Sequence, residues 1–222
     1  MTLRIDGLWR YPVKTLAGEA LTTAELTLAG IPHDRIVHVR GPEGVRTSRR
    51  HYRLLGLKGS RDANGRPLVD GHPWDSAQAL VAVLAAAGSD AWLEAYDGPE
   101  RFDILPLLVA TDGAVAAFGH DIRRLRPNIL ISGVEGLDEF TWPGSELHIG
   151  DAMIRLDSRR GRCAMTTVDP DTLQRDPGVL RDIVRRFDGQ LALNADVARP
   201  GIVRVGDVVA LVGPSAAGPG RS

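Results

Sequence analysis

Short apolar runs, broken by Gly and Pro, set the strongest limit on how this chain can fold. The 222 residues include 25 Gly and 14 Pro. These two residue types separate runs such as Ile36 to Val39, Ile129 to Ile131 and Leu147 to Ile149. Runs of this length suit strands and are too short for most helices. The pattern predicts a mainly β protein of the α+β class, a closed or partly closed β-barrel with a few peripheral helices.

Two segments have the start and stop signals of longer helices. The first spans residues 76 to 87, where Asp75 or Ser76 can cap the start and Gly88 can end the helix. The second begins near Pro177, which suits the first turn, and its apolar residues repeat at helical spacing until Gly189. Both helices are therefore expected at the edges of the β structure.

Three further segments carry weaker signals. The apolar run Ile104 to Val109 predicts a buried strand, and Asp112 to Phe118 predicts a short helix. Near the end of the chain, two apolar runs flank Gly206-Asp207, which predicts a hairpin over residues 202 to 211.

A break in the pattern at Asp97-Gly98 suggests a boundary between two parts of the chain. We expect a β-rich subdomain at residues 1–98 and a barrel domain at residues 99–213. The small, polar residues 214–222 predict a disordered tail.

Charge and composition exclude several classes of protein. The formal net charge is −1 with mixed acidic and basic residues, which predicts neither a nucleic-acid nor a membrane partner. No apolar run approaches the roughly 20 residues of a spanning helix, and the first residues lack a secretory signal. A single cysteine excludes an intramolecular disulfide and an iron–sulfur cluster built by this chain alone. A reducing, cytoplasmic setting fits these features.

The single cysteine, Cys163, follows a stretch with three arginines, Arg159-Arg160-Gly161-Arg162. A free cysteine can be a buried structural thiol. Nearby cations instead favour thiolate, the form that ligates transition metals. The six histidines show no metal-ligand spacing, so the chain cannot enclose a bare ion by itself. A metal carried inside an organic cofactor needs only one protein ligand, which permits a molybdenum–pterin cofactor without selecting it.

Basic residues beside strand ends or turns are candidates for binding an anionic cofactor. Each of them could equally be a solvated surface charge. They are Arg10, Lys14, Arg35, Arg49 and Arg126.

Several stretches resemble the MOSC-domain family over about residues 3 to 212, and in particular the amidoxime reducing component group with its bacterial relatives. The stretches are Arg10-Tyr11-Pro12-Val13-Lys14, Gly30 to Arg35 as G-x-x-x-D-R, Arg124-Leu125-Arg126-Pro127-Asn128, Arg162-Cys163 with Thr166 to Thr172, and Gly201 to Asp207. The resemblance implies a MOSC β-barrel core with an N-terminal β-rich subdomain, and Cys163 as the molybdenum ligand.

The same resemblance implies a set of residues that bind the molybdenum–pterin cofactor. Thr15 replaces the family's usual serine and keeps its hydroxyl, and Asp112 follows Thr111 where the family has a second hydroxyl. A carboxylate there would be unfavourable beside an anion unless it points away. The expected cofactor-binding residues are Lys14, Thr15, Arg35, Arg49, Thr111, Arg126 and Asn128.

The function that the resemblance implies is reduction of N-hydroxylated compounds such as hydroxylamines and amidoximes. Electrons would come from a separate flavin or iron–sulfur protein. Asp157, Asp169 or an ordered water could donate protons, although Asp169 and Asp171 are more typical of a turn. Two alternatives are a non-catalytic carrier of cofactor or sulfur, and a degenerate barrel without cofactor.

Overall fold

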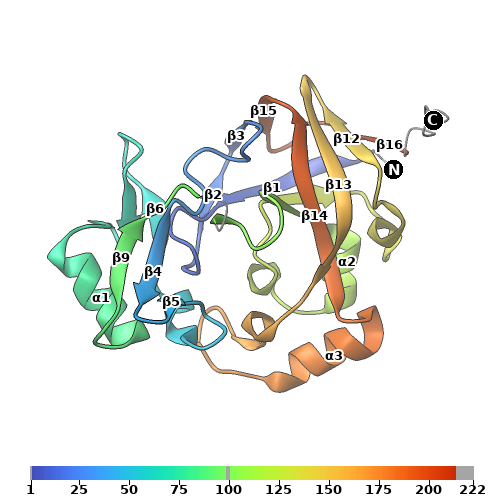
Figure 1. Ribbon diagram of the computed structural model, residues 1–222. Helices are drawn as coiled ribbons and strands as arrows, with labels where there is room; N and C mark the ends of the chain where they lie inside the picture. The colour runs from blue at the N-terminus through green and yellow to red at the C-terminus, as the bar shows by residue number, and fades with distance from the viewer. Residues whose placement is uncertain (1, 99–100, 214–222) are drawn as a thin grey trace, which may run out of the picture.

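The computed structural model describes residues 2–98 and 101–213, and its largest element is an eight-stranded sheet (Figure 1). The strand order is β16-β12-β13-β14-β10-β11-β1-β2. Its pairs are antiparallel except β10 with β11, which is parallel. The strands are β1 (Arg4–Arg10), β2 (Glu19–Leu21), β10 (Leu107–Thr111), β11 (Ile129–Ser132), β12 (Glu146–Ile149), β13 (Ala152–Gly161), β14 (Gln190–Arg199) and β16 (Ala210–Val212).

Three smaller sheets complete the β structure. One joins β3 to β15, a second has the order β5-β4-β9, and a third has the order β6-β7-β8. Their strands are β3 (Thr23–Leu26), β15 (Gly201–Arg204), β4 (Val37–Gly41), β5 (Gly44–Val45), β9 (Trp92–Ala95), β6 (Gly59–Arg61), β7 (Pro67–Val69) and β8 (His72–Pro73).

Three α-helices are found in the described residues, and they begin and end close to where the sequence predicts. They are α1 (Ala77–Ala87), α2 (Asp112–Phe118) and α3 (Pro177–Phe187). The Ser76 side chain accepts a hydrogen bond from the Ala79 N–H at the start of α1, and the Asp176 side chain caps α3 in the same way. Short 3₁₀ helices are η1 (Tyr52–Gly56), η3 (Ile122–Arg124), η4 (Asp138–Thr141) and η5 (Ala164–Thr167).

The two halves of the chain share the large sheet. β1 lies between β11 and β2, and β3 pairs with β15 near the end of the chain. A separate apolar core forms where β4, β7 and α1 meet, with Val39, Val69 and Val83 fully buried. The first part of the chain therefore contributes both to the main sheet and to a second layer beside it, as Figure 1 shows. A division into domains at residue 98 stays a prediction.

Three expectations differ from the structure. Among the described residues the edge strands β16 and β2 do not pair with each other, so the mainly β fold is present but a closed barrel is not found. The predicted terminal hairpin is wrong, because β15 pairs with β3 whereas β16 pairs with β12. The buried strand begins only at Leu107, since Ile104 is 57% exposed. The predicted disordered tail, 214–222, lies outside the described residues.

Within residues 2–98 and 101–213, no helix combines the length and the apolar character needed to cross a membrane.

Candidate functional site

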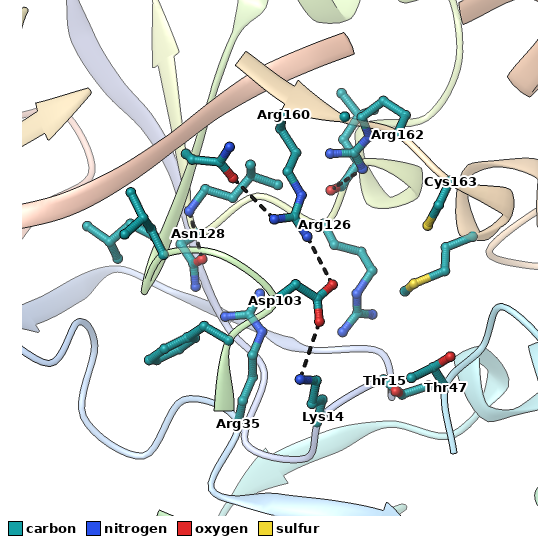
Figure 2. A pocket seen from close by; sticks show the side chains of 18 of the residues that line it. Lys14, Thr15, Arg35, Thr47, Asp103, Arg126, Asn128, Arg160, Arg162 and Cys163 are labelled. Atoms are coloured by element: carbon teal, nitrogen blue, oxygen red, sulfur yellow. Dashed lines mark hydrogen bonds and ion pairs between the residues drawn. The ribbon is translucent and has the colours of Figure 1, made fainter. Parts of the chain in front are cut away.

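A strongly cationic pocket lies where the second layer meets the large sheet (Figure 2). Seven of the eight residues expected from the sequence line it, and Thr111 does not. Further lining residues come from residues 102–105 and from β13 and β14. The lining is formed by Lys14, Thr15, Arg35, Thr47, Arg49, Phe102, Asp103, Leu105, Leu107, Leu108, Arg124, Leu125, Arg126, Asn128, Arg160, Gly161, Arg162, Cys163, Met165 and Asn194.

Positive charge exceeds negative charge in this lining. Seven of the lining side chains are Lys or Arg, and Asp103 is the one carboxylate among the lining residues that the structure describes. Asp103 contacts Lys14 Nζ at 3.3 Å, Arg49 Nη2 at 3.3 Å and Arg160 Nη2 at 2.9 Å. Burial by itself raises the pKa of Asp103, but Lys14, Arg160 and Arg49 outweigh it and hold that pKa below its usual value. Asp103 is therefore ionised at neutral pH.

Asp34 connects three of the sequence motifs beneath the pocket. It is fully buried, and Oδ1 accepts from the Tyr11 backbone N–H at 2.7 Å. Oδ2 accepts from Asn128 Nδ2 at 3.2 Å and also from Arg35 Nη1. One carboxylate thus fixes the relative positions of segments that are more than 90 residues apart in sequence.

The Tyr11 ring orients two of the pocket's cations. Arg126 lies over the ring at 4.3 Å from its centroid, and Arg35 lies at 5.0 Å. The Tyr11 hydroxyl donates to the Pro127 carbonyl at 2.8 Å. Burial raises the pKa of Tyr11 to about 12, although Arg126 and Arg35 oppose that rise. Tyr11 is therefore a neutral support for two guanidinium groups.

Two arginines of the lining have no carboxylate partner within residues 2–98 and 101–213. In the part of the chain that the structure describes, Arg126 forms no ion pair, and Arg162 donates only to the Leu125 carbonyl, at 2.8 Å. Arg162 Nε is buried without a hydrogen-bond partner. Burial lowers the pKa of both guanidinium groups to about 10. Both remain charged at neutral pH, so their charge is left for a ligand to neutralise.

Cys163 stands at a turn where the large sheet meets a short helix. β13 ends at Gly161, and the Cys163 carbonyl accepts from the Thr166 N–H at 3.0 Å as η5 begins. The thiol is partly exposed and lines the pocket. A hydrogen bond with Cys163 raises the pKa of Arg49, against the opposing effect of burial. A sulfur ligand therefore faces the same space as the unpaired guanidinium groups, as Figure 2 shows for Arg126 and Arg162.

Backbone conformations that side chains rarely adopt cluster at the pocket. Among the described residues, eight other than Gly have positive φ, and three of these line the pocket. They are Thr15 at 86°, Arg35 at 56° and Arg126 at 57°. Such conformations cost about 1–3 kcal/mol each and persist where the surrounding contacts enforce them. Their concentration marks this region as a candidate functional site.

Some expected site residues have structural contacts. Thr111 is fully buried, where its hydroxyl donates to Glu139 and accepts from the first turn of α2. Asn128 lines the pocket, but its side chain bonds Leu108 N–H, the Trp9 carbonyl and Asp34.

Two carboxylates near the expected site also have structural contacts. Asp112 does not line the pocket, and its carboxylate accepts from the Gly133 and Val134 N–H groups. Asp169 accepts from Asp171 N–H and from the Thr172 N–H and hydroxyl, which confirms its turn role.

The sequence motifs do not identify Asp34 or Asp103 as functional candidates. Asp34 falls inside the G-x-x-x-D-R stretch, which signals its presence but not its partners. Asp103 belongs to no recognisable motif, and its ion pairs with Lys14 and Arg160 join segments that are far apart in the sequence. The sequence predicts only a domain boundary near Asp103, at Asp97-Gly98.

The donor set suits an anionic group that brings its own metal. Among the described residues no three His, Cys, Asp or Glu side chains gather as a metal site. The pocket offers one thiol, cations without carboxylate partners, and the orphaned Arg162 Nε. These residues fit a phosphate-bearing pterin that presents a metal to a single thiolate.

Known proteins resemble this chain in both parts. The MOSC N-terminal beta barrel domain matches residues 2–70, and the MOSC domain matches residues 105–210. Human mitochondrial amidoxime-reducing component 1 is 31% identical over 130 residues, which cover 50% of this chain and 38% of that protein. Mitochondrial amidoxime reducing component 2 of Macaca fascicularis is 37% identical over 76 residues, 32% of this chain and 22% of that protein. The matched segments thus span less than half of either relative.

A solved structure supports the fold. The YUAD protein from Bacillus subtilis aligns over 97% of this chain and 98% of its own, with a TM-score of 0.54 and 16% identity. At this identity the likeness concerns the fold alone. The two domain matches together cover most of the sequence, and the chain belongs to the MOSC-domain family.

Proposed function

We propose that this protein binds a molybdenum–pterin cofactor, with Cys163 as its ligand to the metal. One observation carries the proposal: a partly exposed thiol shares its pocket with seven cationic side chains and a single carboxylate. A bare cation would be repelled from such a lining, whereas an anionic cofactor would neutralise it. Membership of the MOSC family supports the same cofactor.

The residues divide the work of holding such a cofactor. Arg126 and Arg162 supply charge-assisted hydrogen bonds, because neither has a carboxylate partner among the described residues. Lys14 and Arg49 would exchange part of their contact with Asp103 for a phosphate oxygen. Asn128 holds the pocket wall in place rather than reaching into it, because its amide is bonded to the protein.

We propose that the reaction is the two-electron reduction of N-hydroxylated compounds. R–NH–OH takes up two electrons and two protons, its N–O bond breaks, and R–NH₂ and water leave. When bound, molybdenum supplies the oxygen-abstracting redox chemistry. The amidoxime-reducing names of the relatives support this substrate class. A separate protein would supply the electrons, as the family resemblance implies, and the one cysteine of this chain excludes an iron–sulfur cluster that it builds alone.

The side chains also limit how protons arrive. Asp103 is held ionised by three cations, so at neutral pH it accepts hydrogen bonds and does not deliver a proton. Asp169 is committed to its turn. Water at the open side of the pocket is then the proton source that this arrangement favours, with Asp103 orienting it.

Metal and pterin analysis of freshly purified protein tests the proposal, beside Cys163→Ala and the size-matched Cys163→Ser. We expect near-stoichiometric molybdenum in the wild type, and loss of most activity towards benzamidoxime with a viologen donor in both variants. Equal molybdenum and equal activity in all three proteins would exclude Cys163 as ligand. Cofactor binding without reduction in the wild type would identify a carrier.

A further inference from the structure

A second, shallower groove lies on the outer side of the helix that follows Cys163. Its lining combines apolar and basic side chains. Val179, Ile183 and Phe187 turn the opposite side of α3 into the core. Val184 in the groove is 58% exposed. The lining consists of Ala164, Thr167, Arg175, Pro177, Leu180, Arg181, Val184 and Arg185.

The groove carries uncompensated positive charge. Within residues 2–98 and 101–213, Arg175 and Arg181 have no carboxylate partner, and Arg175 lies over the Tyr52 ring at 5.6 Å. Arg185 shares the Asp182 carboxylate with Arg186, at 2.6 and 2.8 Å. Asp182 therefore serves two arginines, and Asp176 accepts from the Gly178 N–H at the start of the helix. A negatively charged surface would complement the groove.

The groove is separated from the candidate metal site by a single turn of chain. Ala164 and Thr167 line the groove, and both belong to η5. Cys163 is the residue immediately before η5, and its side chain lines the cationic pocket. A redox protein seated in the groove would thus come as near to the Cys163 sulfur as one 3₁₀ turn allows.

We propose that this groove is the docking surface for an acidic one-electron carrier protein, an inference that rests on the proposed function. Transient redox interfaces are small, and complementary charge guides their encounter. On α3, Leu180 and Val184 lie one turn apart beside Arg181 and Arg185, so the groove offers apolar and cationic contacts together, which suits such an interface. One turnover requires two docking events. In each, one reduced carrier gives up one electron to the protein, and solvent provides the two protons.

Charge reversal in the groove tests the proposal. Benzamidoxime reduction by cofactor-loaded protein would be driven either by reduced flavodoxin, an acidic flavin protein, or by reduced methyl viologen. For Arg181→Glu combined with Arg175→Glu, we expect the KM for flavodoxin to rise at least about tenfold. Arg181→Glu alone should give a smaller rise. Viologen-driven turnover should stay within about twofold of wild type, because a small donor needs no docking surface.

The matched control is Arg204→Glu on β15, at the end of the molecule opposite α3 in Figure 1. It makes the same charge change and should leave the KM for flavodoxin unchanged. Wild-type turnover with flavodoxin should also weaken as salt rises.

An unchanged KM for flavodoxin in the double variant would overturn the docking surface. An equal rise of this KM in Arg204→Glu would overturn it too. So would a wild type that turns over with viologen but not with flavodoxin. If cofactor-loaded wild type reduced nothing with viologen, the proposed function would fail and this inference with it.

Discussion

The two walls of the cationic pocket, one at Asp34 and one at Cys163, differ in whether their polar groups have partners within the protein. Around Asp34, both carboxylate oxygens have protein partners: Oδ1 accepts from the Tyr11 backbone N–H, and Oδ2 accepts from Arg35 and from Asn128 Nδ2. Around Cys163, Arg162 Nε has none, and Arg126 lacks a counter-ion among the described residues. Burial of unpaired polar groups costs free energy, so folding alone does not explain the second wall.

The comparison separates support from binding. Residues of the paired wall should matter for stability, and residues of the unpaired wall should matter for ligand affinity. Four substitutions test this division.

The largest expected effect is on the paired wall. Asp34→Ala leaves Arg35 without its partner and orphans the Tyr11 N–H, so we expect the free energy of unfolding to fall by about 3–5 kcal/mol. Urea unfolding of the cofactor-free protein at pH 7 measures it. Asp75→Ala is the matched control, because Asp75 pairs with Arg66 at the surface and its loss should change little. Similar losses in both variants would remove the distinction between the walls.

His38 sharpens the comparison, because it is buried and unpaired but does not line the pocket. Neither ring nitrogen has a hydrogen-bond partner of normal geometry, and the ring stacks on Tyr96 at 4.6 Å. Burial, then Lys14 and Arg40, lowers the pKa of His38 to about 4. Between pH 6.5 and 4 the unfolded chain binds a proton that the folded chain refuses, so acid should remove up to about 3 kcal/mol of stability.

We therefore expect His38→Phe to flatten the fall in stability between pH 6.5 and 4. Denaturant unfolding at several pH values measures this, with the exposed His72→Phe as control. A pH dependence as steep in His38→Phe as in the wild type would contradict the assignment.

Substitutions in the unpaired wall should lower the affinity for the cofactor. Arg126→Met removes a cation that has no counter-ion among the described residues. We therefore expect molybdenum retention after dialysis to fall at least about tenfold, while apo stability changes by only about 1 kcal/mol. Arg123→Met is the control, since Arg123 is paired with Asp121 and Asp171 outside the pocket. Collapse of the apo Arg126→Met protein would show that Arg126 supports the fold.

The smallest effect concerns Thr15, which lines the pocket. Its hydroxyl donates to the Arg46 carbonyl at 3.5 Å, a long bond. Thr15→Val keeps the β-branched shape and removes the donor, so we expect a loss of about 0.5–1 kcal/mol in thermal melts and unchanged cofactor content. Thr15→Ser retains the hydroxyl and serves as control. Loss of cofactor in Thr15→Val alone would assign the hydroxyl to the ligand.

Local signals in the sequence predicted much of the secondary structure. Ser76 and Gly88 bracket α1, and Asp176 with Pro177 opens α3, because capping involves atoms only two to four residues apart. The same signals failed for the terminal hairpin. Its two strands found other partners, β3 and β12, that lie far away in the sequence.

For the site, the sequence by itself determined which chemistry was present: one thiol, many arginines and the motifs that hold them. Only the tertiary structure decided which of those groups form contacts within the protein and which are left for a ligand. Thr111 went to the start of α2, Asn128 to the Asp34 cluster, and Asp103 to three cations at once. The physical reason is that pairing over such separations depends on the whole chain's packing, which no local spacing encodes.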